Sequence, residues 1–372
     1  MTLYTDIPTR AEIDALWNSA FPTSVSLYVP TEPASSGEAE RIAFKNLARA
    51  GLDQLAGADK NDLAAVEEEL ADLEEDDDFW RHQARTLAVF ATPAWLRTFR
   101  LPNRLTELAV GGARLYVKPL MRTVTFPQTA FVLALALAQG GVRLLETVPD
   151  APPVLVRVPD MPDDVASAVG KASIKDRAPI RRLQGDEGQK VRIRQYARRI
   201  DHALREVLPG HGVPLVIAAT EPLDSIFRSV CRYPDVVPES VPGNPESVPD
   251  VELVQQARAV LDRYHAVGLA ELHALFERRA GQNRTSTDVA TVARLVTQGA
   301  VDTLFVDIDG VVPGEVDEDG AVRFDTGQDR GGIGVVDEIT RRAWLSGVRL
   351  LAVRRNDVPG GGDLAAILRY AA

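Results

Sequence analysis

The chain has 372 residues, of which 45% are hydrophobic and 26% are charged, as in ordinary globular proteins. At roughly 100–200 residues per domain, this length predicts about three domains. The single cysteine, Cys231, excludes an internal disulfide framework and zinc sites built from clustered thiolates. The longest uncharged apolar run, 130–138, is far shorter than the roughly 20 residues of a membrane span. No signal-peptide pattern opens the chain, so we expect a cytoplasmic protein without a membrane partner.

Charge is distributed unevenly along the chain. The net charge of −11 argues against a protein that coats nucleic acid with its whole surface. Segment 171–205 nevertheless carries eleven basic residues against four acidic ones, a net charge of +7, which leaves −18 for the rest. An acidic protein with one basic segment can touch a polyanion locally without condensing on it.

The first third of the chain, residues 1–127, reads as a mixed α/β domain. Alternation and helical spacing of apolar residues predict strands over 24–31, 87–92 and 95–101 and helices over 38–55 and 63–73. A turn at Gly111-Gly112 is expected to join strands 106–110 and 114–118 into a hairpin.

The middle segment, residues 128–233, predicts a three-layer α/β domain. The expected strands are 129–138, 142–148, 154–158 and 214–220, and the expected helices are 191–208 and 221–231. Residues 234–250 follow, with the pentapeptide PESVP twice. Dense prolines prevent regular structure, so we expect a linker there.

The last segment, residues 251–372, predicts an α/β/α sandwich. The expected helices are 251–280, 288–298, 334–345 and 363–370, and the expected strands are 301–307 and 349–354. Asp319-Gly320 indicates a hairpin, and Asp363, after three glycines, is expected to cap the final helix.

Motifs for metals and cofactors give weak signals. The stretch LFVDIDGVV at 304–312 resembles a phosphatase nucleophile strand, but only 62 residues follow Gly310, too few for the remaining Mg²⁺ ligands. We interpret it as a strand that ends in a turn. No histidine pair has metal-ligand spacing, and no dinucleotide-binding or P-loop motif occurs, so we expect neither metal nor cofactor.

The basic segment is the strongest functional signal. Glu187-Gly188-Gln189 is expected in an exposed loop, followed by a helix whose apolar positions are Ile193, Tyr196 and Ile200. The basic side chains between these positions are expected to face solvent and contact phosphate; the alternative is salt bridging to acidic residues elsewhere. The predicted RNA-binding residues are Arg181, Arg182, Lys190, Arg192, Arg194, Arg198 and Arg199.

Stretches in all three segments resemble translation factors. GGGDLAAILRY at 360–370 closely resembles the C-terminal signature of archaeal and eukaryotic class I release factors and Pelota. FVLALALAQGGVRLLE at 131–146 looks like their RNase H-like central domain. The N-terminal stretches SVSLYVPT, DDDFWRHQARTLAVFATP and ARLYVKPL are similar to the bacterial archaeo-eukaryotic release factor family.

This resemblance implies a three-domain, tRNA-shaped factor of the ribosomal A site. Its middle domain would point toward the peptidyl transferase centre, and its C-terminal domain toward the stalk base and a translational GTPase such as EF-Tu. The implied partners are the 70S ribosome and ribosomal RNA.

The sequence departs from the family at the GGQ loop of active release factors. Glu187 stands in place of the first glycine, and phosphate charge would repel its carboxylate. We therefore expect a factor that occupies the A site of idle or stalled ribosomes without hydrolysing peptidyl-tRNA, as the Balon-like hibernation factors of this family suggest. One alternative is a peptidyl-tRNA hydrolase for ribosome rescue with Gly188 and Gln189 at its centre. The other is a non-ribosomal RNA-binding protein.

Overall fold

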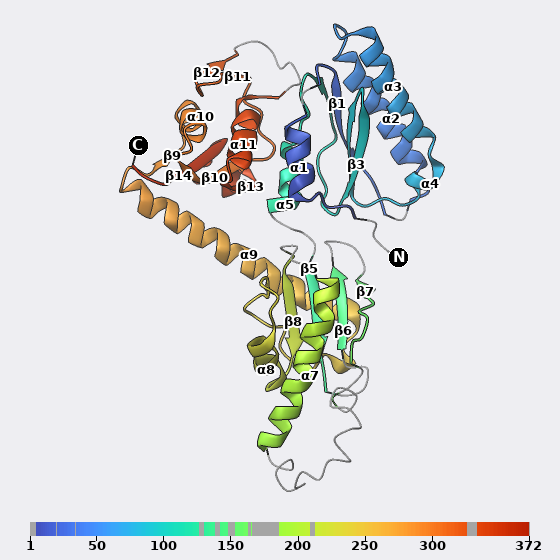
Figure 1. Ribbon diagram of the computed structural model, residues 1–372, viewed down its shortest axis with the longest axis vertical. Helices are drawn as coiled ribbons and strands as arrows, with labels where there is room; N and C mark the ends of the chain where they lie inside the picture. Colours follow the sequence, from blue (N-terminus) through green and yellow to red (C-terminus); the bar gives the residue numbers. More distant parts are fainter. Residues whose placement is uncertain are drawn as a thin grey trace. The chain divides into compact units, whose positions relative to one another are not determined.

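The computed structural model describes residues 5–19, 21–33, 35–125, 130–137, 142–147, 153–162, 165, 186–208, 213–325 and 333–371. Helices and strands are combined in both units of the chain, which confirms the predicted α/β class (Figure 1). The chain divides into two units: residues 127–268, and residues 2–126 together with 269–372. Within the described ranges, no helix combines the length and apolar character that crossing a bilayer requires.

The N-terminal region is built on an antiparallel sheet with the strand order β3-β2-β1-β4. Its strands are β1 (Ser24–Pro30), β2 (Thr86–Thr92), β3 (Trp95–Leu101) and β4 (Leu108–Gly112). Its helices are α1 (Arg10–Trp17), α2 (Glu38–Asp53), α3 (Lys60–Glu75), α4 (Asp77–Trp80) and α5 (Met121–Thr125), with a 3₁₀ turn η1 (Lys118–Leu120). Alternate residues of β1 face opposite layers: Leu27 packs with α2 and α3, whereas Tyr28 packs with α1.

The predicted hairpin at Gly111-Gly112 is wrong. Both glycines belong to β4, which pairs with β1, and no strand forms over 114–118. A Cβ atom on Gly111 would lie 2.2 Å from the backbone oxygen of Gly51 in α2. Glycine is required here by the close approach of a helix to a strand rather than by a turn.

The C-terminal region is an α/β/α sandwich, as predicted. Its sheet has the order β13-β10-β14-β9, with β10 and β13 parallel and β14 antiparallel to both its neighbours. Its strands are β9 (Thr285–Ser286), β10 (Val301–Asp307), β13 (Arg349–Val353) and β14 (Leu364–Leu368). Helices α10 (Val289–Thr297) and α11 (Val335–Leu345) cover one face, and the end of α9 (Asp250–Ala280) packs on the other. Strands β11 (Gly314–Val316) and β12 (Val322–Phe324) form the predicted hairpin.

The final helix predicted over 363–370 is wrong, because this stretch is strand β14. All five of its residues are buried: Leu364, Ala366 and Leu368 face one core, and Ala365 and Ile367 face the other. A strand buried on both faces has no polar alternation to reveal its period. The backbone oxygen of Asp363 accepts the N–H of Asp307 at 2.9 Å, so Asp363 opens a strand rather than capping a helix.

The central unit has the predicted three layers. Its sheet has the order β7-β6-β5-β8, with β5 and β8 parallel and the other pairs antiparallel. The strands are β5 (Ala130–Leu135), β6 (Val142–Thr147), β7 (Val154–Val156) and β8 (Leu215–Ala219). Helices α7 (Asp186–Val207) and α8 (Leu223–Val230) cover one face, and the first half of α9 covers the other (Figure 1).

The proline-rich segment 234–250 is not the predicted linker. Val237 and Val241 are buried, and their N–H groups donate to the backbone oxygens of Leu215 and Ile217 in β8 at 2.9 and 2.8 Å. The residues between the prolines supply the backbone N–H donors that proline lacks, so the segment lies along the edge of the sheet. It also contains a 3₁₀ turn, η4 (Pro245–Ser247). The division between units falls inside α9, after residue 268.

The N- and C-terminal regions, predicted as separate domains, share one core within the second unit. A buried ion pair crosses it: the Lys118 ammonium lies 3.3 Å from Asp337 Oδ1, without hydrogen-bond alignment, and donates to the backbone oxygen of Gly310. Gly334 N–H donates to Asp337 Oδ2 at 2.7 Å. Burial raises the pKa of the Asp337 carboxyl, and the Lys118 ammonium opposes this shift.

Lys118→Met should destabilise this unit by about 3–5 kcal/mol at pH 7, because it leaves a buried carboxylate without its cation. All four tryptophans lie in this unit, so urea unfolding followed by tryptophan fluorescence measures it selectively. The loss should shrink at pH 5, since protonation of Asp337 removes the unpaired charge.

The matched control is Arg323→Met, which breaks the exposed Arg323–Glu315 pair, whose side chains are 81% and 75% accessible. Exposed pairs contribute about 0–1 kcal/mol, so this variant should unfold nearly like the original chain. Equal losses for the two variants would contradict a special role for the buried pair.

Candidate nucleic-acid interface

Helix α7 is anchored to the central sheet by an apolar stripe. Ile193, Tyr196, Ile200 and Leu204 are buried at spacings of three and four residues, against Leu133, Leu144 and Ile217 of the sheet among others. The Tyr196 hydroxyl donates to the backbone oxygen of Ala136 at 3.0 Å. This stripe fixes the rotation of α7 about its axis, and with it the direction of every other side chain.

The helix begins earlier than the sequence predicts. Residues 187–189, expected in an exposed loop, lie in the first turn of α7, where Gly188 is buried and Gln189 is exposed. A glycine inside a helix costs about 1 kcal/mol relative to alanine, so the sequence favoured a loop at this position. The Gly-Gln pair nevertheless has helical rather than loop backbone.

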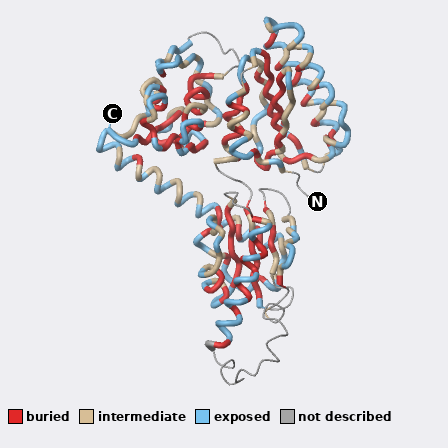
Figure 2. The backbone as a smooth tube through the Cα atoms, viewed as in Figure 1, coloured by how far each residue is buried: buried red, intermediate tan, exposed pale blue. Residues whose placement is uncertain are grey.

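Five of the predicted RNA-binding residues lie on the outer side of α7. Lys190, Arg192, Arg194, Arg198 and Arg199 are all exposed, as the pale outer side of this helix in Figure 2 illustrates. Lys190, Arg194 and Arg198 follow one another at four-residue steps along one flank of the exposed face, whereas Arg192 and Arg199, seven residues apart, follow the other. Arg181 and Arg182 lie outside the described residues.

These five cations have no acidic partner among the side chains that the structure describes, which do not include those of Asp186 and Glu187. None of them forms an ion pair there, whereas Arg205, on the same helix, pairs with Asp201. Salt bridging to the described side chains therefore does not account for these five cations. Like charges four residues apart destabilise a helix by about 0.2–0.5 kcal/mol per pair, so this row reduces the stability of α7. Such a row is typical of a surface that contacts a polyanion.

Sequence reasoning missed the role of Asp201. Its carboxylate is buried, with Oδ1 accepting the N–H of Arg232 at 2.8 Å and Oδ2 accepting from Arg205. It thereby ties α7 to the segment that follows α8. The only signal in the sequence was an acidic residue four positions before an arginine, in a stretch (190–205) whose other charged residues are basic.

Other candidate chemistry receives no support. Burial raises the pKa of the Cys231 thiol, which keeps it in the unreactive protonated form. The Asp309 N–H donates to Asp307 Oδ1 at 3.2 Å, in the turn that the sequence predicts after this strand. Among the described residues, no three His, Cys, Asp or Glu side chains are grouped so as to hold a metal ion.

Comparisons with known proteins assign the class of the central unit. Residues 127–267 match the model of bacterial archaeo-eukaryotic release factor family 11. The central unit is therefore of the release-factor type, and the resemblance to this bacterial family predicted from the sequence is confirmed there. No curated protein matches the chain.

Similar solved structures come from archaea and yeast. The archaeal translation termination factor aRF1 is 15% identical, with 98% of this chain and 99% of that chain covered and a TM-score of 0.26. A ribosome-bound archaeal Pelota, described together with ABCE1, is 13% identical, with coverages of 99% and 96% and a TM-score of 0.40. S. cerevisiae Dom34 is 8% identical, with coverages of 75% and 74% and a TM-score of 0.41.

Arg194 lies four residues from both Lys190 and Arg198, so Arg194→Glu turns two repulsive pairs into attractive ones. This change should stabilise α7 by about 1 kcal/mol. Hydrogen exchange of the α7 amides measures this as slower exchange. Arg205→Glu on the same helix serves as the opposite control, because it removes a partner of the buried Asp201 and should cost about 1–3 kcal/mol. Faster exchange in Arg194→Glu would reveal a partner for Arg194 and contradict the description of this surface.

Proposed function

We propose that this protein is a cytoplasmic translation factor that binds the 70S ribosome through ribosomal RNA. In this proposal it occupies the A site of idle or stalled ribosomes, in hibernation or quality control, without hydrolysing peptidyl-tRNA. The observation that carries the proposal is the exposed basic surface of α7, in a unit that matches a release-factor family model.

The charge of α7 supports RNA as the partner. Five exposed cations on one helix can replace the counterions of several phosphates, and that release drives association with a polyanion. The remainder of the chain is strongly acidic, so contact with RNA is favourable only where the basic surface faces it.

The conformation of Gly188 and Gln189 supports a non-hydrolytic role. A glutamine that positions a water for attack must bring its backbone within about 3 Å of the ester, in a geometry where 1 Å of misplacement costs about 100-fold in rate. Here the pair lies in the first turn of a helix, with Gly188 buried. Helical backbone lacks the freedom that paired loop glycines give.

The proposal includes a translational GTPase as a second partner. Dom34 is described as interacting with Hbs1, and the ribosome-bound archaeal Pelota is described with ABCE1. For this chain, the GTPase partner comes from the family resemblance, which implies a factor such as EF-Tu in contact with the C-terminal sandwich.

Changing Arg194, Arg198 and Arg199 to glutamate should abolish co-sedimentation with 70S ribosomes, because phosphate attraction becomes repulsion. The milder change of all three to glutamine should weaken binding. It should also reduce the slope of log affinity against log salt concentration by about 2 to 3, corresponding to about 0.7–0.9 per lost phosphate contact.

The control carries the same change of charge elsewhere: Arg49, Lys60 and Arg278 are exposed residues of α2, α3 and α9 and form no ion pair within the described ranges. Their triple glutamate variant should still co-sediment. Normal co-sedimentation of a folded α7 variant would contradict the proposal. If this control variant lost binding to both ribosomes and free RNA, the net charge of the chain, and not the position of its cations, would determine binding.

Gln189→Ala should leave ribosome affinity within about twofold, because the proposal gives this side chain no contact that binding depends on. Neither form should release peptide from a P-site peptidyl-tRNA in a single-turnover assay, with a stop-codon release factor as the positive control. Release by the unmodified chain that disappears in Gln189→Ala would instead establish the hydrolase alternative.

A further inference from the structure

The central unit contains a pocket at the end of its basic helix. The pocket has a volume of about 300 Å³ and lies between the second half of α7 and the segment that follows α8. It is lined by Asp201, Leu204, Arg205, Leu208, Cys231, Arg232, Tyr233 and Pro234. Small-molecule sites begin at about this volume, and a single planar ring system fits within it.

The pocket continues the row of cations on α7. Lys190, Arg194 and Arg198 lie on one flank of α7. Further along the same flank, at steps of three and four residues, come Asp201, Arg205 and Leu208, the last directly after the helix. These last three residues line the pocket. Arg198 and Arg205 are seven residues apart, about 10 Å along the axis. This is about the rise of three nucleotides in one strand of a helix. A strand whose phosphates follow the row therefore reaches the pocket.

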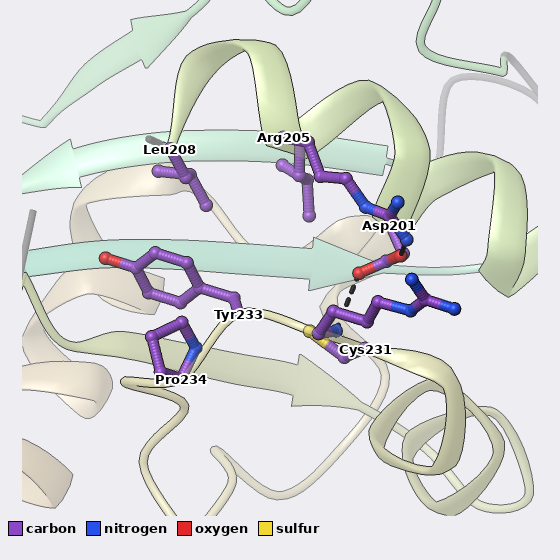
Figure 3. Close-up of a pocket in the computed structure, with 8 residues that line it drawn as sticks. Asp201, Arg205, Leu208, Cys231, Tyr233 and Pro234 are labelled. Carbon is purple, nitrogen blue, oxygen red and sulfur yellow. Dashed lines mark hydrogen bonds and ion pairs between the residues drawn. The ribbon is translucent and has the colours of Figure 1, made fainter. Parts of the chain in front are cut away.

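The walls of the pocket suit a flat, partly apolar ligand with polar edges. Figure 3 shows the Tyr233 ring and Pro234 on one side, Leu208 on the other, and the Asp201 carboxylate at the far end. The Tyr233 hydroxyl donates to the backbone oxygen of Val213 at 2.6 Å, which holds the ring in place. Burial raises the pKa of Tyr233 to about 12, so its ring stays neutral.

The polar end of the pocket has unused acceptor capacity. Asp201 Oδ1 accepts the Arg232 N–H, Oδ2 accepts from Arg205, and the Cys231 thiol is a third neighbour of this carboxylate. A carboxylate offers about four acceptor sites, so one remains. The exocyclic amino groups of adenine, cytosine and guanine are donors for the remaining acceptor capacity. Uracil has no amino group, and its ring N3–H lies between two carbonyl oxygens that a carboxylate repels. Arg205 and Arg232 offer donors for ring nitrogens and carbonyl oxygens.

We propose that this pocket binds one unstacked RNA base that carries an exocyclic amino group. The base lies against Tyr233, its amino group donates to Asp201, and its phosphates extend along the Lys190–Arg194–Arg198 row. Sequence-selective RNA recognition commonly works in this way, through splayed bases stacked on aromatic side chains. The proposal rests on the proposed function, since it supplies a base contact to the RNA surface argued there.

The test uses the full chain and labelled ten-nucleotide RNAs of adenine, cytosine or uracil alone, measured by fluorescence anisotropy at one salt concentration. Oligo-A and oligo-C should bind about tenfold more tightly than oligo-U. Tyr233→Leu should remove that preference by removing the stacking surface, and Tyr233→Phe, which keeps the ring, should retain it. Asp201→Asn, with its fold checked by circular dichroism, should also lose the preference, because an amide has less acceptor capacity.

The phosphate row and the pocket give separate readouts. The glutamine variant of Arg194, Arg198 and Arg199 should bind all three RNAs more weakly while keeping their order of affinity. Equal affinity for the three RNAs in the unmodified chain, or an unchanged order in Tyr233→Leu, would overturn the pocket proposal while leaving the ribosome proposal intact. Unchanged affinity in the glutamine variant would overturn the ribosome proposal instead.

Discussion

The apolar stripe of α7 packed on the central sheet is the constraint on which the functional surface depends. Burying Ile193, Tyr196 and Ile200 orients the helix, so the basic residues between them point to solvent whether or not a ligand is present. A fully buried large apolar side chain contributes about 1.5–3 kcal/mol, which far exceeds the few tenths lost to each repulsive pair of cations. The fold can therefore present a charged row that is unfavourable in the free protein.

The uneven distribution of charge bears on which part of the chain can approach a polyanion. The second unit carries an exposed acidic helix face on α3, including Glu67, Glu68 and Asp72. Under the proposed function, RNA phosphates are repelled by such a face and attracted by the basic residues of α7, which favours contact through α7. Because these are long-range forces between exposed charges, salt should weaken the discrimination.

The sequence predicted those features that have a clear period. The two faces of α7 follow from residues spaced three and four apart, and the alternation in β1 gives that strand directly. Strand β14 was predicted as a helix because five consecutive apolar residues fit either structure when both faces are buried. The position of Gly111 against α2 and the pairing of Val237 and Val241 with β8 are long-range contacts that local patterns do not contain.

The basic residues of the candidate site were predicted from the sequence, but the hydrogen bonds of Asp201 were not. Nothing in the spacing showed that Asp201 accepts a hydrogen bond from the backbone of Arg232, thirty-one residues later. The pocket beside it depends on that tertiary contact and on the segment after α8, so periodicity could not reveal it. The helical start at Asp186 was missed because a glycine two positions later indicates a loop more often than a first turn.

A cryo-EM map of the protein on empty 70S ribosomes tests the central claim most directly. The account predicts density for the chain in the A site, with the Arg194 and Arg198 side chains of α7 within hydrogen-bonding distance of ribosomal RNA phosphates. A bound chain whose α7 faces solvent, with another surface on the RNA, would contradict it.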